Sequence, residues 1–147
     1  MSILVVIEHQ SGAMHRMSWE TLCAGQQLAR SRGVKLFAVV VGADAAPLAA
    51  QLAGKKLDCV YIANHALLAA YTADGYVRAL RQVIDRLKPQ IIILPHTYRT
   101  RDFAPKLAAS FDRNLISDVI GIDSKHAQPM CIRPLFQGKL YAEIPLD

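Results

Sequence analysis

The stretch IIILPHTYRTRDFAPKLAAS, residues 91–110, decides the fold that we expect for this chain. It begins with an unbroken apolar run, passes through hydroxyl and guanidinium side chains, and continues as a predicted helix. A strand that leads through a loop into a helix is typical of open parallel sheets. Ligands of such sheets bind at these loops because the free N–H groups of the helix attract negative charge. The loop is therefore the first candidate site.

The rest of the chain repeats this alternation of strand and helix. Short apolar runs rich in β-branched residues predict strands that are buried on both faces, as in a parallel sheet, at residues 3–7, 34–42, 57–64 and 91–94. The segments between them predict helices at residues 18–33, with Ser18 as the N-cap, and at residues 44–54 and 74–88. We therefore expect an α/β fold with a mainly parallel, doubly wound sheet and helices on both faces.

The C-terminal part breaks this rhythm. Residues 131–144 contain two strand-like runs on either side of Gln137, Gly138 and Lys139. A short polar connection that contains glycine predicts an antiparallel hairpin. At 147 residues, the chain is expected to form a single domain over residues 1–147.

The net charge of +5 is concentrated in one stretch. Residues 78–113 contain three acids and eight bases: Arg78, Arg81, Arg86, Lys88, Arg99, Arg101, Lys106 and Arg113. Nucleic-acid-binding patches usually include stacking aromatic residues or a recognition helix, and this stretch shows neither pattern. We therefore expect a solvated or partner-facing surface and no nucleic acid, although a nucleic-acid binder using this stretch remains an alternative.

The sequence also argues against a membrane or secreted protein. No apolar stretch approaches the roughly 18 residues of a membrane span, and the N-terminus lacks the charged region of a signal peptide. The three cysteines are far apart, which favours reduced thiols over disulfides or zinc. We therefore predict a cytoplasmic location.

The residue patterns give no catalytic constellation. Glycine-rich phosphate loops, metal-ligand spacing of histidines and an activated nucleophile are all missing from the sequence. We therefore expect no enzyme activity and neither a metal nor a cofactor site in this chain.

The opening loop itself is interpreted through Pro105. Proline is best tolerated in the first turn of a helix, which predicts that the fourth helix begins near Asp102. Asp102 would then be the N-cap, and its carboxylate would use the N–H groups that a bound phosphate needs. Arg99 and Arg101 are expected to project outward toward a partner.

Two segments resemble the alpha subunits of electron transfer flavoproteins. HTYRTRDFAPKLAASFDRNLISDVIGID is similar to a family segment with Gly-Arg-Asp-Leu-Ala-Pro-Arg before a helix and an Ile-Ser-Asp-Val strand, and IRPLFQGKLYAEI is similar to a later Arg-Pro motif. Thr100 replaces a glycine of the family pattern, and Lys139 and Leu140 replace an Asn-Ala pair. The positions that match are Thr97, Arg101, Asp102, Pro105, Ser117, Asp118, Arg133, Pro134 and Gly138.

The resemblance implies the N-terminal domain of such a subunit, with an adenine nucleotide alpha hydrolase-like fold. It would be a scaffold that packs on the beta subunit and supports the FAD domain in electron transfer from dehydrogenases. FAD would be held by the C-terminal domain, which lies outside this chain. Arg99, Arg101 and Arg133 would be the candidate partner contacts. The alternative is an adenine-nucleotide-binding module of the universal stress type, which uses the carboxyl ends of the same strands.

Overall fold

The computed structural model describes residues 1–125 and 128–146 of the chain. These residues form two compact units, Met1–Arg113 and Asn114–Asp147, which are described separately. The single domain expected over residues 1–147 stays a prediction.

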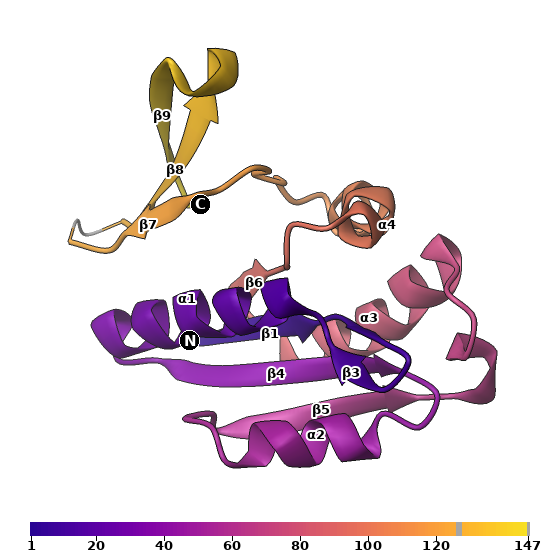
Figure 1. The fold of residues 1–147 in the computed structure, drawn as a ribbon. Helices are drawn as coiled ribbons and strands as arrows, with labels where there is room; N and C mark the ends of the chain where they lie inside the picture. Colours follow the sequence, from indigo (N-terminus) through magenta and orange to yellow (C-terminus); the bar gives the residue numbers. More distant parts are fainter. Residues whose placement is uncertain (126–127, 147) are drawn as a thin grey trace. The chain divides into compact units, whose positions relative to one another are not determined.

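The first unit is built on a four-stranded parallel sheet (Figure 1). Its strands are β1 (Ser2–Ile7), β4 (Lys35–Gly42), β5 (Cys59–Asn64) and β6 (Ile91–Ile93), in the spatial order β5-β4-β1-β6. The central strand β1 lies between β4 and β6, so that Leu4 stands opposite both Phe37 and Ile92. All four strands were expected from their apolar runs. The expected burial on both faces holds for the inner strands β1 and β4 but is wrong for β5 and β6, which lie at the edges of the sheet and contain no buried residue.

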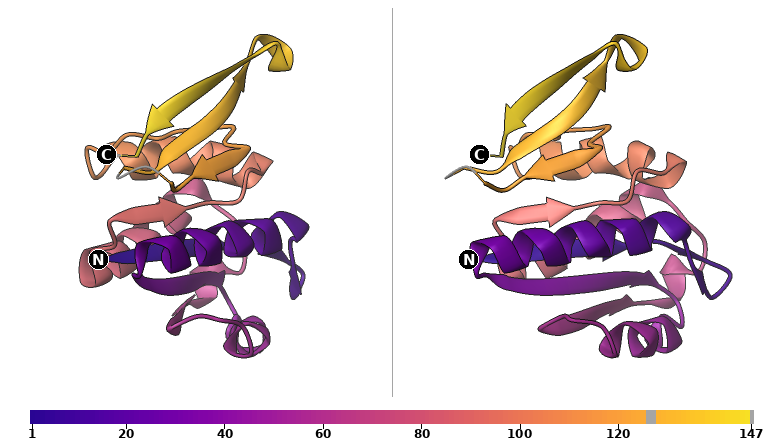
Figure 2. Two further views of the ribbon diagram at one scale, coloured as in Figure 1. Left: turned by 90° about the vertical axis from the view of Figure 1, so that its left-hand side faces the viewer. Right: turned by 60° about the vertical axis from the view of Figure 1, so that its left-hand side comes forward.

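Helices cover both faces of this sheet, as predicted. The helices are α1 (Arg16–Arg32), α2 (Ala46–Ala53), α3 (Ala73–Leu87) and α4 (Tyr98–Ala109), with a short 3-10 turn η1 (Ala66–Leu68) before α3. The helix α1 lies along β1 and β4 (Figure 2). On the opposite face, α3 and α4 pack against β1 and β4 in one core cluster made of Leu4, Val6, Val39, Val41, Tyr76, Leu80, Ile84, Phe103 and Leu107.

The start of α1 differs from the prediction. The helix begins at Arg16, and its N-cap is His15, whose Nδ1 accepts a hydrogen bond of 3.2 Å from the N–H of Met17. Ser18 lies inside the first turn and is fully buried. Its prediction as the N-cap is wrong because its hydroxyl bonds to the chain that leaves β1, as described below.

A small hairpin after β1 was not predicted. The strands β2 (His9–Gln10) and β3 (Ala13–Met14) are antiparallel and are joined by Ser11 and Gly12. Both turn residues have positive φ, 49° and 77°, which is the geometry of the tightest hairpin turns. Each strand has only two residues, which is too short for an alternation of polar and apolar side chains to be recognised.

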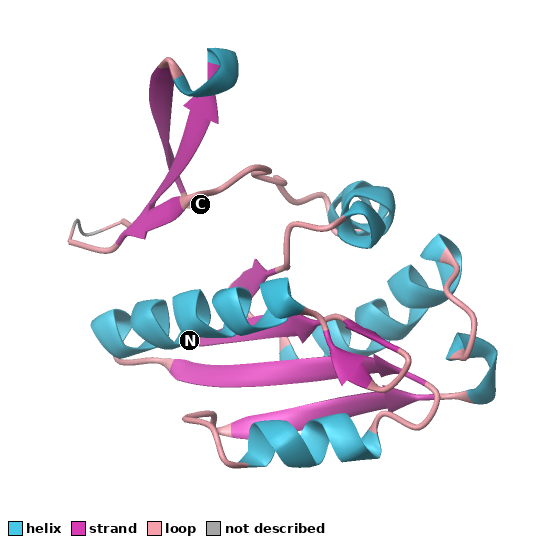
Figure 3. Ribbon diagram, viewed as in Figure 1, coloured by secondary structure: helices cyan, strands magenta, loops and turns pink. Residues whose placement is uncertain are grey.

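The second unit is a three-stranded antiparallel sheet (Figure 3). Its strands β7 (Gly121–Asp123), β8 (Met130–Leu135) and β9 (Leu140–Pro145) are in sequence order, and η2 (Phe136–Gly138) joins β8 to β9. The predicted hairpin around Gly138 is therefore confirmed. The strand implied over residues 116–119 is wrong, since Asp118 has a φ of 56°, which is incompatible with extended backbone.

Among the described residues, no helix has the length and apolar character needed to cross a membrane.

Candidate functional site: the switch-point network

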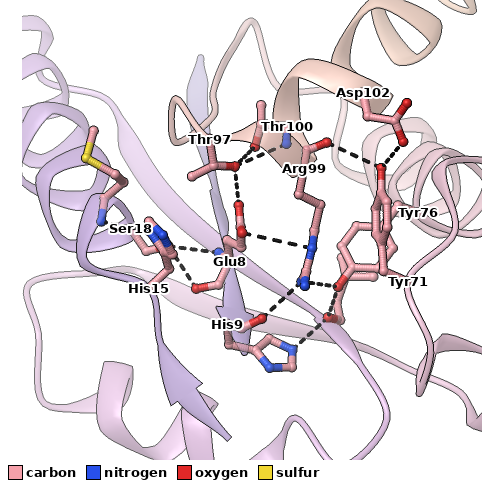
Figure 4. A network of polar contacts seen from close by, with 12 residues as sticks. Glu8, His9, His15, Ser18, Tyr71, Tyr76, Thr97, Arg99, Thr100 and Asp102 are labelled. Atoms are coloured by element: carbon pink, nitrogen blue, oxygen red, sulfur yellow. Dashed lines mark hydrogen bonds and ion pairs between the residues drawn. The ribbon is translucent and has the colours of Figure 1, made fainter. Parts of the chain in front are cut away.

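The order of the strands predicts a crevice at the carboxyl ends of β1 and β6. The chain builds the sheet outward from β1 through β4 to β5, and then returns to the other side of β1 with β6. This reversal is a topological switch point, where open α/β sheets usually bind ligands. The loop after β1 begins with Glu8, and the loop after β6 ends with Thr97 at the start of α4. Figure 4 shows the polar network that joins these two loops.

The carboxylate of Glu8 lies at the centre of this network. The hydroxyl of Thr97 donates a short hydrogen bond to its Oε2, and the Nε of Arg99 lies 3.9 Å from its Oε1 (Figure 4). The side chain of Glu8 is only 11% exposed. An anion buried to this extent requires a counter-charge, and Arg99 supplies it.

The backbone of Glu8 is fixed by α1. The Oγ of Ser18 accepts a hydrogen bond of 2.8 Å from the N–H of Glu8 and donates one of 3.0 Å to its carbonyl oxygen. The N–H of His15 donates to the same carbonyl at 2.9 Å. The start of α1 therefore holds the residue whose carboxylate enters the crevice.

The guanidinium of Arg99 makes its contacts within the first unit. Its Nη1 donates to the carbonyl oxygen of His9 at 3.0 Å and to the hydroxyl of Tyr76 at 3.4 Å. Its guanidinium carbon lies 5.0 Å from the ring centre of Tyr71 and 5.8 Å from that of Tyr76, within the range of cation–π interactions. Its side chain is 22% exposed. The prediction that Arg99 projects outward is therefore wrong, because the buried Glu8 draws it inward.

The helix cap was also assigned to the wrong residue. The helix α4 begins at Tyr98, and the hydroxyl of its N-cap Thr97 accepts a hydrogen bond of 3.1 Å from the N–H of Thr100. Asp102 lies inside the helix and is exposed, and one of its carboxylate oxygens accepts a hydrogen bond of 2.6 Å from the hydroxyl of Tyr71. Asp102 therefore joins α4 to the segment before α3 and does not cap the helix.

Pro105 misled this prediction because it lies in the interior of α4. Its missing N–H leaves the carbonyl of Arg101 without the usual helical donor, which costs about 3 kcal/mol in a helix interior. Three buried residues on the same helix offset this cost by packing into the core: Phe103, Ala104 and Leu107.

Tyr71 and Tyr76 line the crevice next to Arg99. Their rings meet edge to face with centres 5.0 Å apart, and the hydroxyl of Tyr76 donates to the carbonyl oxygen of Val41 at 3.3 Å. Burial raises the pKa of Tyr71, and the hydrogen bond and negative charge of Asp102 raise it further. Burial also raises the pKa of Tyr76, against the opposing effect of Arg99. Both hydroxyls therefore stay protonated and act as donors.

His9 lies beside the two tyrosines, over the end of β4. Its Nε2 lies 2.9 Å from the carbonyl oxygen of Val41 and therefore donates to it. A Cβ added at Gly42 would lie 2.6 Å from this Nε2, so the imidazole needs a glycine at this position. Its Nδ1 is buried and has no hydrogen-bond partner among the described residues. The ring therefore packs against the backbone and adds no ligand to the crevice.

The other predicted partner contacts lie elsewhere. Arg101 is on the exposed side of α4, with its guanidinium carbon 5.9 Å from the ring centre of Tyr98. Arg133 belongs to β8 of the second unit, where its Nη2 lies 3.8 Å from a carboxylate oxygen of Asp118. Its Nε is buried without a hydrogen-bond partner among the described residues. The network of Figure 4 therefore includes Arg99 but neither of the other two arginines.

The crevice does not fit a phosphate group as it stands. The hydroxyl of Thr97 and the guanidinium of Arg99 are typical phosphate ligands, but both already contact the carboxylate of Glu8. A phosphate would have to replace this carboxylate and leave it buried without a counter-charge. No group of three potential metal ligands occurs in the part of the chain that the structure describes. The arrangement joins four segments: the loop after β1, the start of α1, the tyrosines around the start of α3, and the start of α4.

Sequence reasoning missed most of this network. It identified the loop and Arg99, but not Glu8, Tyr71, Tyr76 or the role of Ser18. One signal was available: Glu8 directly follows the buried strand β1, at the carboxyl end where polar side chains of a parallel sheet meet.

Fold and crevice together define a doubly wound α/β domain, and comparison with known proteins identifies its family. The family model described as the electron transfer flavoprotein domain matches residues 3–146. The chain therefore belongs to the electron transfer flavoprotein family.

Curated relatives agree with this assignment. The chain is similar to the electron transfer flavoprotein subunit alpha of Clostridium acetobutylicum (31% identity) and of Bacillus subtilis (30%), with 97% of this chain and 43% of each relative covered. It is also similar to the protein FixB of Azorhizobium caulinodans, with 32% identity over 97% of this chain and 40% of the relative. The chain thus spans less than half the length of these relatives.

The cap assignment can be tested by comparing two substitutions. Thr97→Ala should lower the free energy of unfolding by about 1 to 2 kcal/mol, because it removes a helix cap and a donor to the buried Glu8. Thr97→Ser keeps the hydroxyl and should cost much less. Denaturant unfolding of both variants measures the difference. Equal losses for alanine and serine would show that the hydroxyl does not matter.

The raised tyrosine pKa values predict a loss of stability at high pH. The folded pKa of Tyr71 lies above the unfolded value of about 10. Its contribution is therefore fully present below pH 10 and is lost as the pH rises toward the folded pKa, since the unfolded state releases its proton first. The loss of unfolding free energy between pH 8 and pH 11 should be smaller in Tyr71→Phe than in the wild type. An identical loss in both proteins would refute the coupling.

Proposed function

We propose that this chain is a scaffold domain of an electron transfer flavoprotein, which packs on the beta subunit and supports the FAD domain of a complete alpha subunit. The observation that carries the proposal is the Glu8–Arg99 pair. It occupies the switch point with the chain's own side chains, which supports a role as a rigid surface.

The proposed domain has no cofactor and no catalytic step of its own. FAD is held by the remaining part of a complete alpha subunit. Electron transfer from dehydrogenases therefore requires the complete subunit. The proposed location is the cytoplasm, which is consistent with the free thiols of Cys23, Cys59 and Cys131. The adenine-nucleotide module has less support, because its phosphate would compete with Glu8 for Thr97 and Arg99.

The second unit supports a role in assembly. It is a single-layer sheet, and it exposes large apolar side chains around its hairpin: Phe136 at 72%, Tyr141 at 62% and Leu140 at 58%. A sheet of this kind becomes stable when an apolar face is covered by another layer. Arg133 and Arg101 are the arginines that we propose as partner contacts, since Arg99 is used inside the first unit.

Co-expression tests the proposal. We expect the chain to co-purify with the electron transfer flavoprotein beta subunit of the same organism as a complex of equal stoichiometry, and to be colourless when purified alone. Size-exclusion chromatography with light scattering measures the stoichiometry, and the absorbance spectrum measures flavin. A chain that stays separate from the beta subunit, or that holds FAD stoichiometrically when alone, would contradict the proposal.

A further inference from the structure

The helix α4 begins with an aromatic residue that the fold does not use. Tyr98 is 89% exposed, whereas the helix is capped by Thr97 and anchored in the core by Phe103 and Leu107. One turn later, the guanidinium of Arg101 lies over the ring of Tyr98, with 5.9 Å between its central carbon and the ring centre. We call these two residues the Tyr98–Arg101 pair. It stands on the surface of the first unit.

The helix that presents this pair is held rigidly. Arg99 joins its first turn to the loop after β1, and Asp102 joins its next turn to Tyr71 at 2.6 Å. Each residue of the pair is therefore followed directly by a residue that is bonded to another segment: Arg99 follows Tyr98, and Asp102 follows Arg101. A helix backbone that is already fixed loses little further entropy on binding, which favours association.

The chemistry of the pair is that of a protein contact. Tyrosine and arginine are enriched among the residues that dominate interface energies, because each combines a large contact area with hydrogen-bonding groups. The guanidinium can bind a carboxylate through two parallel hydrogen bonds while its face stays on the aromatic ring. Such a pair fits an apolar hollow with a carboxylate at its edge.

The charge of the stretch that contains the pair favours an acidic partner. Residues 78–113 contain eight bases and three acids. Some of these bases are already used: Arg99 contacts Glu8, and Lys106 lies 3.1 Å from Asp74. The structure gives Arg101 no ion pair with any residue that it describes, so its charge faces outward from an exposed position. A carboxylate on the partner would neutralise it.

We propose that the Tyr98–Arg101 pair is the docking hot spot for an acidic surface of the beta subunit, with Tyr98 in an apolar hollow and Arg101 on a carboxylate beside it. This inference rests on the proposed function, because it takes the beta subunit as the occupant. It adds the residues that dominate the contact and the chemistry that they recognise.

The test measures the affinity of the purified chain for the purified beta subunit by calorimetry. Tyr98→Ala should weaken binding by at least tenfold, and Arg101→Glu should weaken it further because it brings two like charges together. Arg101→Lys keeps the charge but loses the planar fork, and should fall between the wild type and Arg101→Glu. The thermal unfolding of the unbound variants should match the wild type, since both positions are exposed.

Two control variants make the test specific. Arg30→Glu reverses an exposed charge on α1, outside the basic stretch of residues 78–113, and Leu67→Ala truncates an apolar side chain that is 82% exposed. Both should bind within about threefold of the wild type, which is the scale of effects outside a hot spot. Wild-type affinity in Tyr98→Ala and Arg101→Glu would overturn the inference and leave the proposed function intact. A wild-type chain that does not bind the beta subunit would overturn both.

Discussion

Replacing Arg99 with alanine is expected to lower the free energy of unfolding by about 3 kcal/mol. The substitution removes the counter-charge of Glu8, whose side chain is 11% exposed, and the donor to the carbonyl of His9. It also removes the cation that lies against the rings of Tyr71 and Tyr76. The loss exceeds the value of the pair itself, because a buried carboxylate is left without a partner.

A double variant shows how much of the loss in Arg99→Ala comes from the unpaired charge of Glu8. Glu8→Gln with Arg99→Ala should recover part of the loss, since the uncompensated charge is then gone. Arg101→Ala is the matched control and should cost about 0 to 1 kcal/mol, because the residue is exposed. Chemical denaturation of the four proteins measures these values. If Arg99→Ala and Arg101→Ala were equally mild, Arg99 would not be a structural clamp.

Replacing Gly25 with valine is expected to cost about 3 kcal/mol or more. At Gly25, α1 packs closely on the sheet, and a Cβ there would lie 2.6 Å from Cγ2 of Val5 and 3.2 Å from Cδ1 of Leu36. Val5 is fully buried on the central strand β1, so it has no room to move aside. The helix would have to lift from the sheet.

The control for this variant lies on the same helix. Gln27→Val introduces the same side chain at an exposed position, and should cost only the difference in helix propensity, a few tenths of a kcal/mol. The melting temperatures of both variants, measured by thermal unfolding, separate the stability lost through the packing clash from that lost through helix propensity. Similar melting temperatures for Gly25→Val and Gln27→Val would mean that α1 does not pack closely at Gly25.

The sheet of the first unit could be predicted from the sequence because its strands have a strong signal. Each is a continuous apolar run, and the helices between them show an apolar stripe, so the parallel α/β fold follows from the pattern. The antiparallel hairpin followed from Gly138, whose φ of 85° suits glycine. Element type was therefore well determined by local composition.

Helix starts could not be predicted as well. Ser18 and Asp102 are residue types that often cap helices, and each lies inside a helix in the structure. Their polar groups are used by distant segments: Ser18 bonds to Glu8, and Asp102 accepts from Tyr71. Local sequence therefore suggests more than one N-cap for each helix, and the tertiary contacts of Ser18 and Asp102 determine where the helix begins.

The sequence predicted the position of the candidate site but not the residues that form its polar network. The loop before α4 was identified from the pattern of residues 91–110, yet the group that fills the crevice comes from Glu8, 89 residues before Thr97. Only the order of the strands, with β1 beside β6, brings these residues together. Arg99 was expected to face outward for the same reason, since its buried counter-charge is invisible in its own segment.

Calorimetric titration of the purified chain with AMP tests the central claim most directly, namely that Glu8 and Arg99 close the crevice at the switch point. We expect no saturable heat up to about 1 mM AMP, which corresponds to a binding free energy weaker than about −4 kcal/mol. Saturable binding in the micromolar range that is lost in Arg99→Ala would contradict it, because the nucleotide would then occupy the position assigned here to the carboxylate of Glu8.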